Sequence, residues 1–135
     1  MRKTIIATLS AVTLMAAAAP GIGVAGTSDY PVTPFRIEYG ASVLSGSITW
    51  YNRSVSIPGE LRARSSEKQG RFRGTSANCV TPLETRTAQP GENRGFNVGL
   101  NCDYPGGLTN VYVALWEGDT YRGGVVCTRQ GCVED

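Results

Sequence analysis

Period-two alternation of apolar and polar residues is the feature that most limits how this chain can fold. The clearest case is RGFNVGLNC at residues 94–102. Its alternate positions on one side are Phe96, Val98, Leu100 and Cys102. Successive side chains of a β-strand point to opposite faces, so this pattern predicts a half-buried strand. No segment after the first 26 residues keeps the 3.6-residue period of an amphipathic helix, which predicts a protein built from strands.

Other segments repeat the alternation between turns rich in glycine and proline. They are residues 35–40, 48–53, 55–63, 80–88, 108–117 and 120–128. About seven short antiparallel strands predict an all-β sandwich, immunoglobulin-like in outline, and a small closed barrel is the alternative. We expect the last two of these segments to form a three-stranded meander with residues 94–102. Proline inside segments 55–63 and 80–88 favours an edge position or a bulge for each.

Two adjacent aromatic residues occur in the segment ITWYNRSV. Within a strand, Trp50 and Tyr51 point in opposite directions, so they cannot form one flat platform. We expect Trp50 to anchor the core and Tyr51 to lie over a neighbouring strand. The alternative is an exposed Trp50 or Trp116 that stacks on a sugar ring, as in a carbohydrate-binding module.

The first 26 residues have the pattern of a secretory signal peptide. A basic start, MRK, precedes the uncharged apolar run IIATLSAVTLMAAAA, and small residues allow cleavage after Ala25 or Gly26. The run is shorter than the roughly 20 residues of a membrane span, and no second run follows. We therefore expect a secreted protein without a membrane span, with a flexible arm at residues 27–34 and one sandwich domain at residues 35–135.

Four cysteines lie in the part expected to be exported, which favours disulfides. Three pairings are possible, and local closure favours Cys79–Cys102 and Cys127–Cys132. A zinc site is a poor alternative, because the chain has no histidine and its last two cysteines have the spacing Cys-x₄-Cys. We expect no metal and no cofactor.

Charge and composition weaken the case for several functions. The chain has 13 basic and 11 acidic residues, and removal of Arg2 and Lys3 with the leader leaves 11 of each. A balanced chain gives no overall reason to bind nucleic acid or an anionic membrane. The chain has no histidine, so the commonest general base is missing. Glu117 and Asp119 are a pair of carboxylates close together in the sequence, but we interpret them as part of a hairpin turn. The sequence therefore predicts a protein that is not an enzyme.

One local cluster departs from this balance. The segment ELRARSSEKQGRFRG contains four arginines at alternating positions: Arg62, Arg64, Arg71 and Arg73. In a hairpin joined by SSEKQG they would share one face, with Leu61, Ala63 and Phe72 facing the core. Such a ribbon can bind phosphates or carboxylates, so an anionic polymer or an acidic protein surface is the expected partner. The alternative is a solvated edge whose charges prevent aggregation.

The runs ITWYNRSV, RGFNVGLNC and PGGLTNVYVAL resemble small secreted actinobacterial β-sandwich proteins of uncharacterised function. The resemblance covers about residues 47–116, implies export from a bacterium and the sandwich fold, and carries over no site residue. The spacing Cys127-x₄-Cys132 is also similar to a bridged loop of antitumour chromoprotein apoproteins, which hold a hydrophobic ligand. We expect a monomeric, secreted, non-enzymatic binding module. The alternatives are a structural protein of the cell envelope, a small-ligand carrier and a carbohydrate-binding module.

Overall fold

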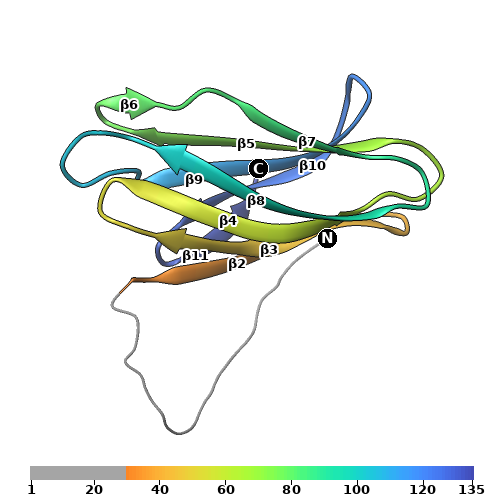
Figure 1. Cartoon of the computed structure of the whole chain (residues 1–135), viewed down its shortest axis with the longest axis horizontal. Coiled ribbons are helices and arrows are strands. Elements are labelled where there is room, and N and C mark those ends of the chain that lie inside the picture. The colour runs from red at the N-terminus through yellow and green to blue at the C-terminus, as the bar shows by residue number, and fades with distance from the viewer. Residues whose placement is uncertain (1–29) are drawn as a thin grey trace, which may run out of the picture. The chain divides into compact units, whose positions relative to one another are not determined.

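Two antiparallel β-sheets face each other in the computed structural model, which describes residues 30–135 (Figure 1). The strands are β2 (Val32–Tyr39), β3 (Ser42–Trp50), β4 (Ser54–Arg62), β5 (Lys68–Ser76), β6 (Cys79–Val80), β7 (Glu84–Ala88), β8 (Asn93–Asn101), β9 (Asn110–Glu117), β10 (Thr120–Thr128) and β11 (Gly131–Glu134). The described residues contain no helix, so none that could span a membrane. The predicted signal peptide lies outside the described residues.

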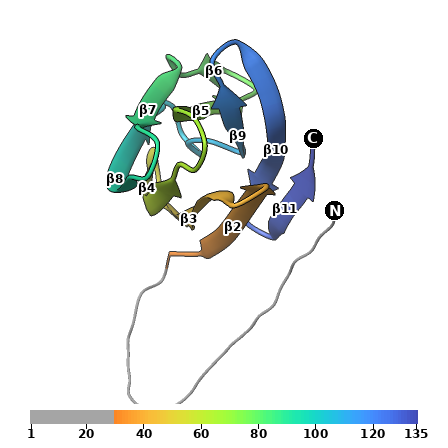
Figure 2. The same ribbon diagram turned by 90° about the vertical axis from the view of Figure 1, so that its right-hand side faces the viewer.

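One sheet has the order β2-β3-β4-β8, and the other has the order β11-β10-β9-β5. In the second sheet β6 and β7 both pair with the remaining edge of β5. Figure 2 shows the two layers end on, with the chain passing from one to the other between β4 and β5 and again between β7 and β8. The all-β sandwich prediction is confirmed, and the closed barrel is wrong.

The inward faces of both sheets supply one hydrophobic core. Its largest fully buried apolar side chains include Trp50, Phe72, Leu44, Ile48 and Ile57. Trp50 is 1% exposed, which confirms its predicted place in the core and excludes it as a sugar platform. Its indole N–H donates to Thr33 Oγ1 at 2.9 Å, and Thr33 Oγ1 donates to the Thr128 carbonyl at 2.7 Å. The first bond joins β3 to β2 within one sheet, and the second joins β2 to β10 of the other sheet.

The N-terminal boundary of the domain differs from the prediction. Residues 32–34, expected in a flexible arm, belong to β2, and Val32–Asp135 forms one compact unit. The reason is the burial of Thr33, whose hydroxyl bridges the two sheets. Residues 27–29 of the predicted arm lie outside the described residues.

Two predicted strands have different limits or neighbours in the structure. The strand expected at residues 48–53 ends at Trp50, because a turn closed by Tyr51 N–H and the Ser54 carbonyl at 2.8 Å follows it. The strand with Pro58 lies between β3 and β8, so its predicted edge position is wrong. Pro58 lacks an N–H, and the β3–β4 ladder has no pair there, whereas pairing with β8 is continuous.

The predicted meander is only partly present. The hairpin β9–β10 forms as expected, but β8 pairs with β4 in the other sheet. A bulge between Tyr121 and Gly123 also shifts the alternation in β10. Tyr121 therefore lies opposite Trp116 on the outer face, although the sequence places it in phase with the buried Val125. The edge strand predicted at residues 80–88 is confirmed only for β7, residues 84–88, which pairs only with β5; Val80 belongs to β6, and residues 81–83 are in no strand.

Both predicted disulfides are present, and no free cysteine remains among the described residues. Cys79–Cys102 connects β6 of one sheet to the end of β8 in the other, with 6.0 Å between the Cα atoms. Cys127–Cys132 joins directly opposed residues of β10 and β11, 3.9 Å apart at Cα. Paired cysteines are compatible with an extracellular protein.

Candidate functional site

The four arginines of the predicted ribbon lie on two different sheets. Arg62 ends β4 and Arg64 follows it, whereas Arg71 and Arg73 belong to β5. Strands β4 and β5 do not pair with each other, because the segment between them crosses from one layer to the other. The predicted four-arginine hairpin is therefore wrong. The prediction that Leu61, Ala63 and Phe72 face the core is confirmed, because all three are fully buried.

Arg71 has a fixed position on the outer face of the six-stranded sheet. Its guanidinium carbon lies 4.1 Å from the centre of the Trp116 ring. Its Nε and Nη2 donate to Gln69 Oε1 at 3.1 and 2.8 Å, and Nη2 makes a long contact of 3.5 Å with the Gly118 carbonyl. All of these partners are uncharged. The guanidinium is thus held in place while its positive charge has no ion-pair partner in the part of the chain that the structure describes.

Most of the other arginines have different partners, although Arg129 also combines a tryptophan ring, that of Trp50 at 5.1 Å, with a backbone carbonyl. Four of them form ion pairs with carboxylates: Arg36, Arg53, Arg86 and Arg122. Three bind backbone carbonyls: Arg64, Arg94 and Arg129. Arg64 also donates to Asn93 Oδ1 at 2.9 Å, which gives it a structural role at the crossover.

Arg73 lies two residues beyond Arg71, on the same face of β5. It is exposed and makes no hydrogen bond or ion pair within residues 30–135. Phe72 between them is fully buried, which confirms that both arginines point away from the core. Arg62 is also exposed and unpaired within the described range, but it lies on the opposite sheet. The structure thus brings together only the second half of the predicted set.

Aromatic side chains border Arg71 and Arg73 on the neighbouring strands. Arg73 lies opposite Tyr112 in the β5–β9 register, and Gln69 lies opposite Trp116. Trp116 also meets Tyr121 edge to face, with ring centres 5.7 Å apart. We call Arg71, Arg73, Tyr112, Trp116 and Tyr121 the arginine–aromatic face.

Both tyrosines of this face favour the neutral, protonated form. Burial is the main reason that the pKa of Tyr112 is raised, and the Asp135 charge adds to it. The Trp116 side chain and Arg71 act in the opposite direction on that pKa. The pKa of Tyr121 is likewise raised, chiefly by burial and then by Asp135. The acidic C-terminal residue thus borders the tyrosines on one side, and the arginines border them on the other.

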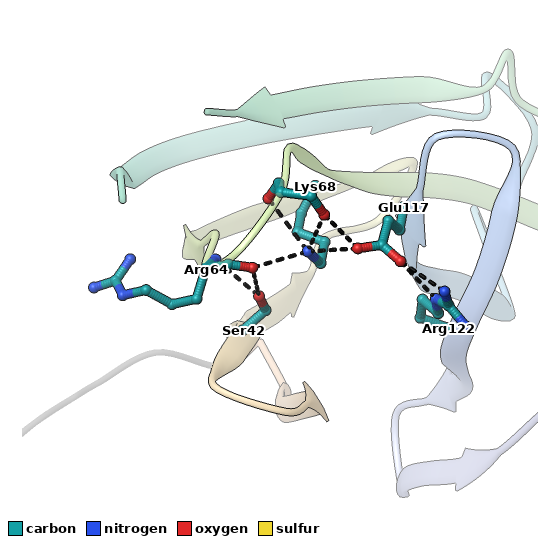
Figure 3. Close-up of polar contacts among 6 residues, drawn as sticks. Ser42, Arg64, Lys68, Glu117 and Arg122 are labelled. Atoms are coloured by element: carbon teal, nitrogen blue, oxygen red, sulfur yellow. Dashed lines mark hydrogen bonds and ion pairs between the residues drawn. The ribbon is translucent and has the colours of Figure 1, made fainter. Parts of the chain in front are cut away.

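A buried lysine anchors the end of the sandwich next to this face (Figure 3). Lys68 is 1% exposed, and its ammonium donates to the carbonyls of Arg64 and Ser66 at 3.0 and 3.2 Å and to Ser66 Oγ at 2.7 Å. It also pairs with Glu117 Oε2 at 3.0 Å, while Arg122 pairs with Glu117 Oε1 at 2.7 Å. The crossover loop and the β9–β10 turn are therefore tied to one carboxylate.

Glu117 is committed to this network. Hydrogen bonds from Ser66, Arg122 and Lys68 lower its pKa to about 2. A carboxyl group that stays ionised at neutral pH cannot serve as a general acid there. The turn that follows Glu117 includes Gly118, whose carbonyl contacts Arg71. The network therefore supports the position of Arg71 as well as the fold.

A second candidate site lies where β4 begins and β8 ends. It is a shallow depression lined by Arg53, Ser54, Asn101 and Asp103. Arg53 pairs with Asp103 at 3.3 Å, so its charge is already compensated. Within residues 30–135, no group of three or more acidic or cysteine side chains could hold a metal ion.

Comparison with known proteins gives no relative for this chain. No protein-family model, no curated protein and no solved structure matches it. The case for the arginine–aromatic face as a functional site therefore depends on its geometry alone. Sequence reasoning did single out Arg71, Arg73 and Trp116, but it missed the stack between Arg71 and Trp116. That contact needs the β5–β9 pairing, which no local pattern in the sequence reveals.

Proposed function

We propose that this protein is exported and acts outside the cell as a non-enzymatic module that binds an anionic ligand through the arginine–aromatic face. The observation that carries the proposal is the state of Arg71, held by a tryptophan ring, an amide and a carbonyl, with no carboxylate partner within residues 30–135. Ordering a free arginine side chain on binding costs conformational entropy. A guanidinium that is already ordered avoids most of that cost.

A second arginine, Arg73, extends the positive charge of the face along β5. Arg73 is exposed and unpaired within the described chain, so all its N–H groups are open to a ligand. Two residues along a strand span about 6.6 Å, so the two charges follow one line along β5. An anionic polymer or an acidic protein surface can meet both charges at once. Export is supported by the signal-like N-terminus and by two disulfides, which are typical of proteins outside the cytosol.

The test is retention of the processed protein on a column of sulfated polysaccharide, eluted with a salt gradient. Arg71→Ala/Arg73→Ala should elute at clearly lower salt than the unmodified protein. The matched control is Arg36→Ala/Arg62→Ala, which removes the same charge from exposed positions on the other sheet. That control should elute close to the unmodified protein. Equal shifts for the two double variants would show that only net charge matters and would refute the proposal.

A further inference from the structure

The two tryptophans differ in what their indole N–H groups meet. Trp50 donates to Thr33 Oγ1 at 2.9 Å. The Trp116 nitrogen is shielded from solvent, and it has no hydrogen-bond acceptor among the described residues. A shielded N–H without an acceptor is costly and rare in folded proteins, and such groups recur at functional sites.

Among the groups around this N–H, only the Tyr112 hydroxyl oxygen could accept a hydrogen bond, whereas the Arg71 guanidinium can only donate. Arg71 stacks on the Trp116 ring, and its Nη1 makes no hydrogen bond within residues 30–135. Tyr112 is close enough for Trp116 to lower its pKa, yet the pair does not reach hydrogen-bond geometry. Burial keeps the Tyr112 hydroxyl protonated, so it too can donate. Arg71 Nη1, the Trp116 N–H and the Tyr112 hydroxyl can therefore all donate, and within residues 30–135 none of the three has an acceptor in hydrogen-bond geometry.

The nearest carboxylate does not fill this role. Asp135 acts on the pKa values of Tyr112 and Tyr121 through its charge. Its backbone N–H bonds to the Gly124 carbonyl at 3.0 Å, which fixes it beside β10. Asp135 therefore repels an anion on the β10 side of the tyrosines and leaves the β5 side, where Arg71 and Arg73 lie, as the favoured approach.

We propose that Arg71, Trp116 and Tyr112 bind one oxyanion group of the ligand, a sulfate, phosphate or carboxylate, with the Trp116 indole N–H as a direct donor. This inference rests on the proposed function and makes it more specific. The oxyanion supplies the acceptor that Trp116 lacks. It takes further hydrogen bonds from Arg71 Nη1 and the Tyr112 hydroxyl, and the Tyr112 side chain turns aside to admit it. Trp116 then both positions the guanidinium and contacts the ligand.

Nitrogen-15 NMR of the processed protein tests this directly, because the chain has two tryptophans and hence two indole N–H signals. Sodium sulfate, sodium phosphate and sodium acetate are titrated separately at constant ionic strength. The Trp116 signal, assigned with Trp116→Phe, should shift and saturate with at least one of the three. The Trp50 signal should stay in place, since Thr33 already satisfies it. The anion with the strongest effect identifies the group that the site prefers.

Three outcomes decide the matter. A saturable shift of Trp116 alone supports the inference. An unmoved Trp116 signal in a protein that keeps its Arg71- and Arg73-dependent retention on sulfated polysaccharide overturns the inference and leaves the proposed function standing. Loss of both the shift and the retention overturns both.

Substitution gives an independent measure. Trp116→Phe keeps an aromatic ring under Arg71 but removes the N–H, and it should weaken polyanion binding about tenfold, as expected for one hydrogen bond to a charged group. Tyr104→Phe removes an exposed hydroxyl between β8 and β9, outside the arginine–aromatic face, so its affinity should equal that of the unmodified protein. Equal affinities of Trp116→Phe and the unmodified protein would reduce Trp116 to a platform and contradict the inference.

Discussion

Replacing Lys68 with methionine should destabilise this domain far more than removing an exposed partner of the same carboxylate. Lys68 is buried, and its ammonium is the shared donor for two backbone carbonyls of the crossover loop, those of Arg64 and Ser66 (Figure 3). Methionine has a similar length and volume, so the substitution removes the donor without opening a large cavity. The main loss is that the Ser66 carbonyl no longer has a partner among the described residues, while the Arg64 carbonyl keeps only the Ser42 hydroxyl, which donates to it at 3.3 Å.

The size of the effect follows from those carbonyls. The Ser66 carbonyl left without its partner costs about 1–3 kcal/mol, and the Arg64 carbonyl loses the shorter of its two hydrogen bonds, so the sum is about 2–3 kcal/mol. This is a large share of the roughly 5–15 kcal/mol that stabilises a typical domain. The melting temperature should fall by roughly 10–15 °C. Arg122→Met should cost much less, because Arg122 is partly exposed and Glu117 keeps Lys68 and Ser66 as partners.

Urea unfolding followed by tryptophan fluorescence measures both variants in one assay. The midpoint for Lys68→Met should move to clearly lower urea with an unchanged slope, and the midpoint for Arg122→Met should move only slightly. Equal midpoints for the two variants would refute the reasoning, because a buried ammonium and a half-exposed guanidinium would then contribute alike.

Three further predictions concern the fold. Serine replacement of Cys79–Cys102 should cost roughly 3.4 kcal/mol and that of Cys127–Cys132 roughly 2 kcal/mol in urea unfolding, because the bridges close separations of 23 and 5 residues; the reverse order would contradict this. The pKa of Glu117 is lowered from its ordinary 4.5 to about 2, so its stabilising effect is complete above pH 4.5 and is lost as the pH falls toward 2. Glu117→Gln should therefore flatten the acid limb of a stability–pH curve. Thr33→Val should cost about 1–3 kcal/mol, because the buried Trp50 N–H loses its acceptor, and an unchanged urea midpoint would argue against that bond.

The sequence predicts burial better than it predicts pairing. Alternation at residues 94–102 depends only on which face of the strand is exposed to solvent, so the buried side of β8 was predicted correctly. The partner of β8 was not, because a strand pairs through contacts distant in sequence that leave no local pattern. The outward direction of the Tyr121 side chain was missed for the same reason. The bulge between Tyr121 and Gly123 adds one residue, which reverses the inward–outward alternation of the side chains before it.

The arginine cluster shows this limit most clearly at the candidate site. Alternation correctly places Phe72 inward and its two neighbouring arginines outward. The polar segment SSEKQG looks like a hairpin turn, yet it carries the chain to the other sheet. The signal that could have shown this is Lys68, the only lysine after the leader. Lys68 is buried at the start of β5, the strand that begins the second sheet. A lysine in a solvated hairpin turn would be exposed instead.

The most direct test of the arginine–aromatic face is the salt dependence of binding to a soluble anionic polymer. Each cation that neutralises a single-stranded polyanion contributes about 0.7 to the slope of log K against log salt concentration. Arg71→Ala/Arg73→Ala should therefore reduce the magnitude of the slope by roughly 1.4, and Arg36→Ala/Arg62→Ala should leave it unchanged. A slope that is the same for the unmodified protein and for Arg71→Ala/Arg73→Ala would contradict the assignment of this face as the binding site.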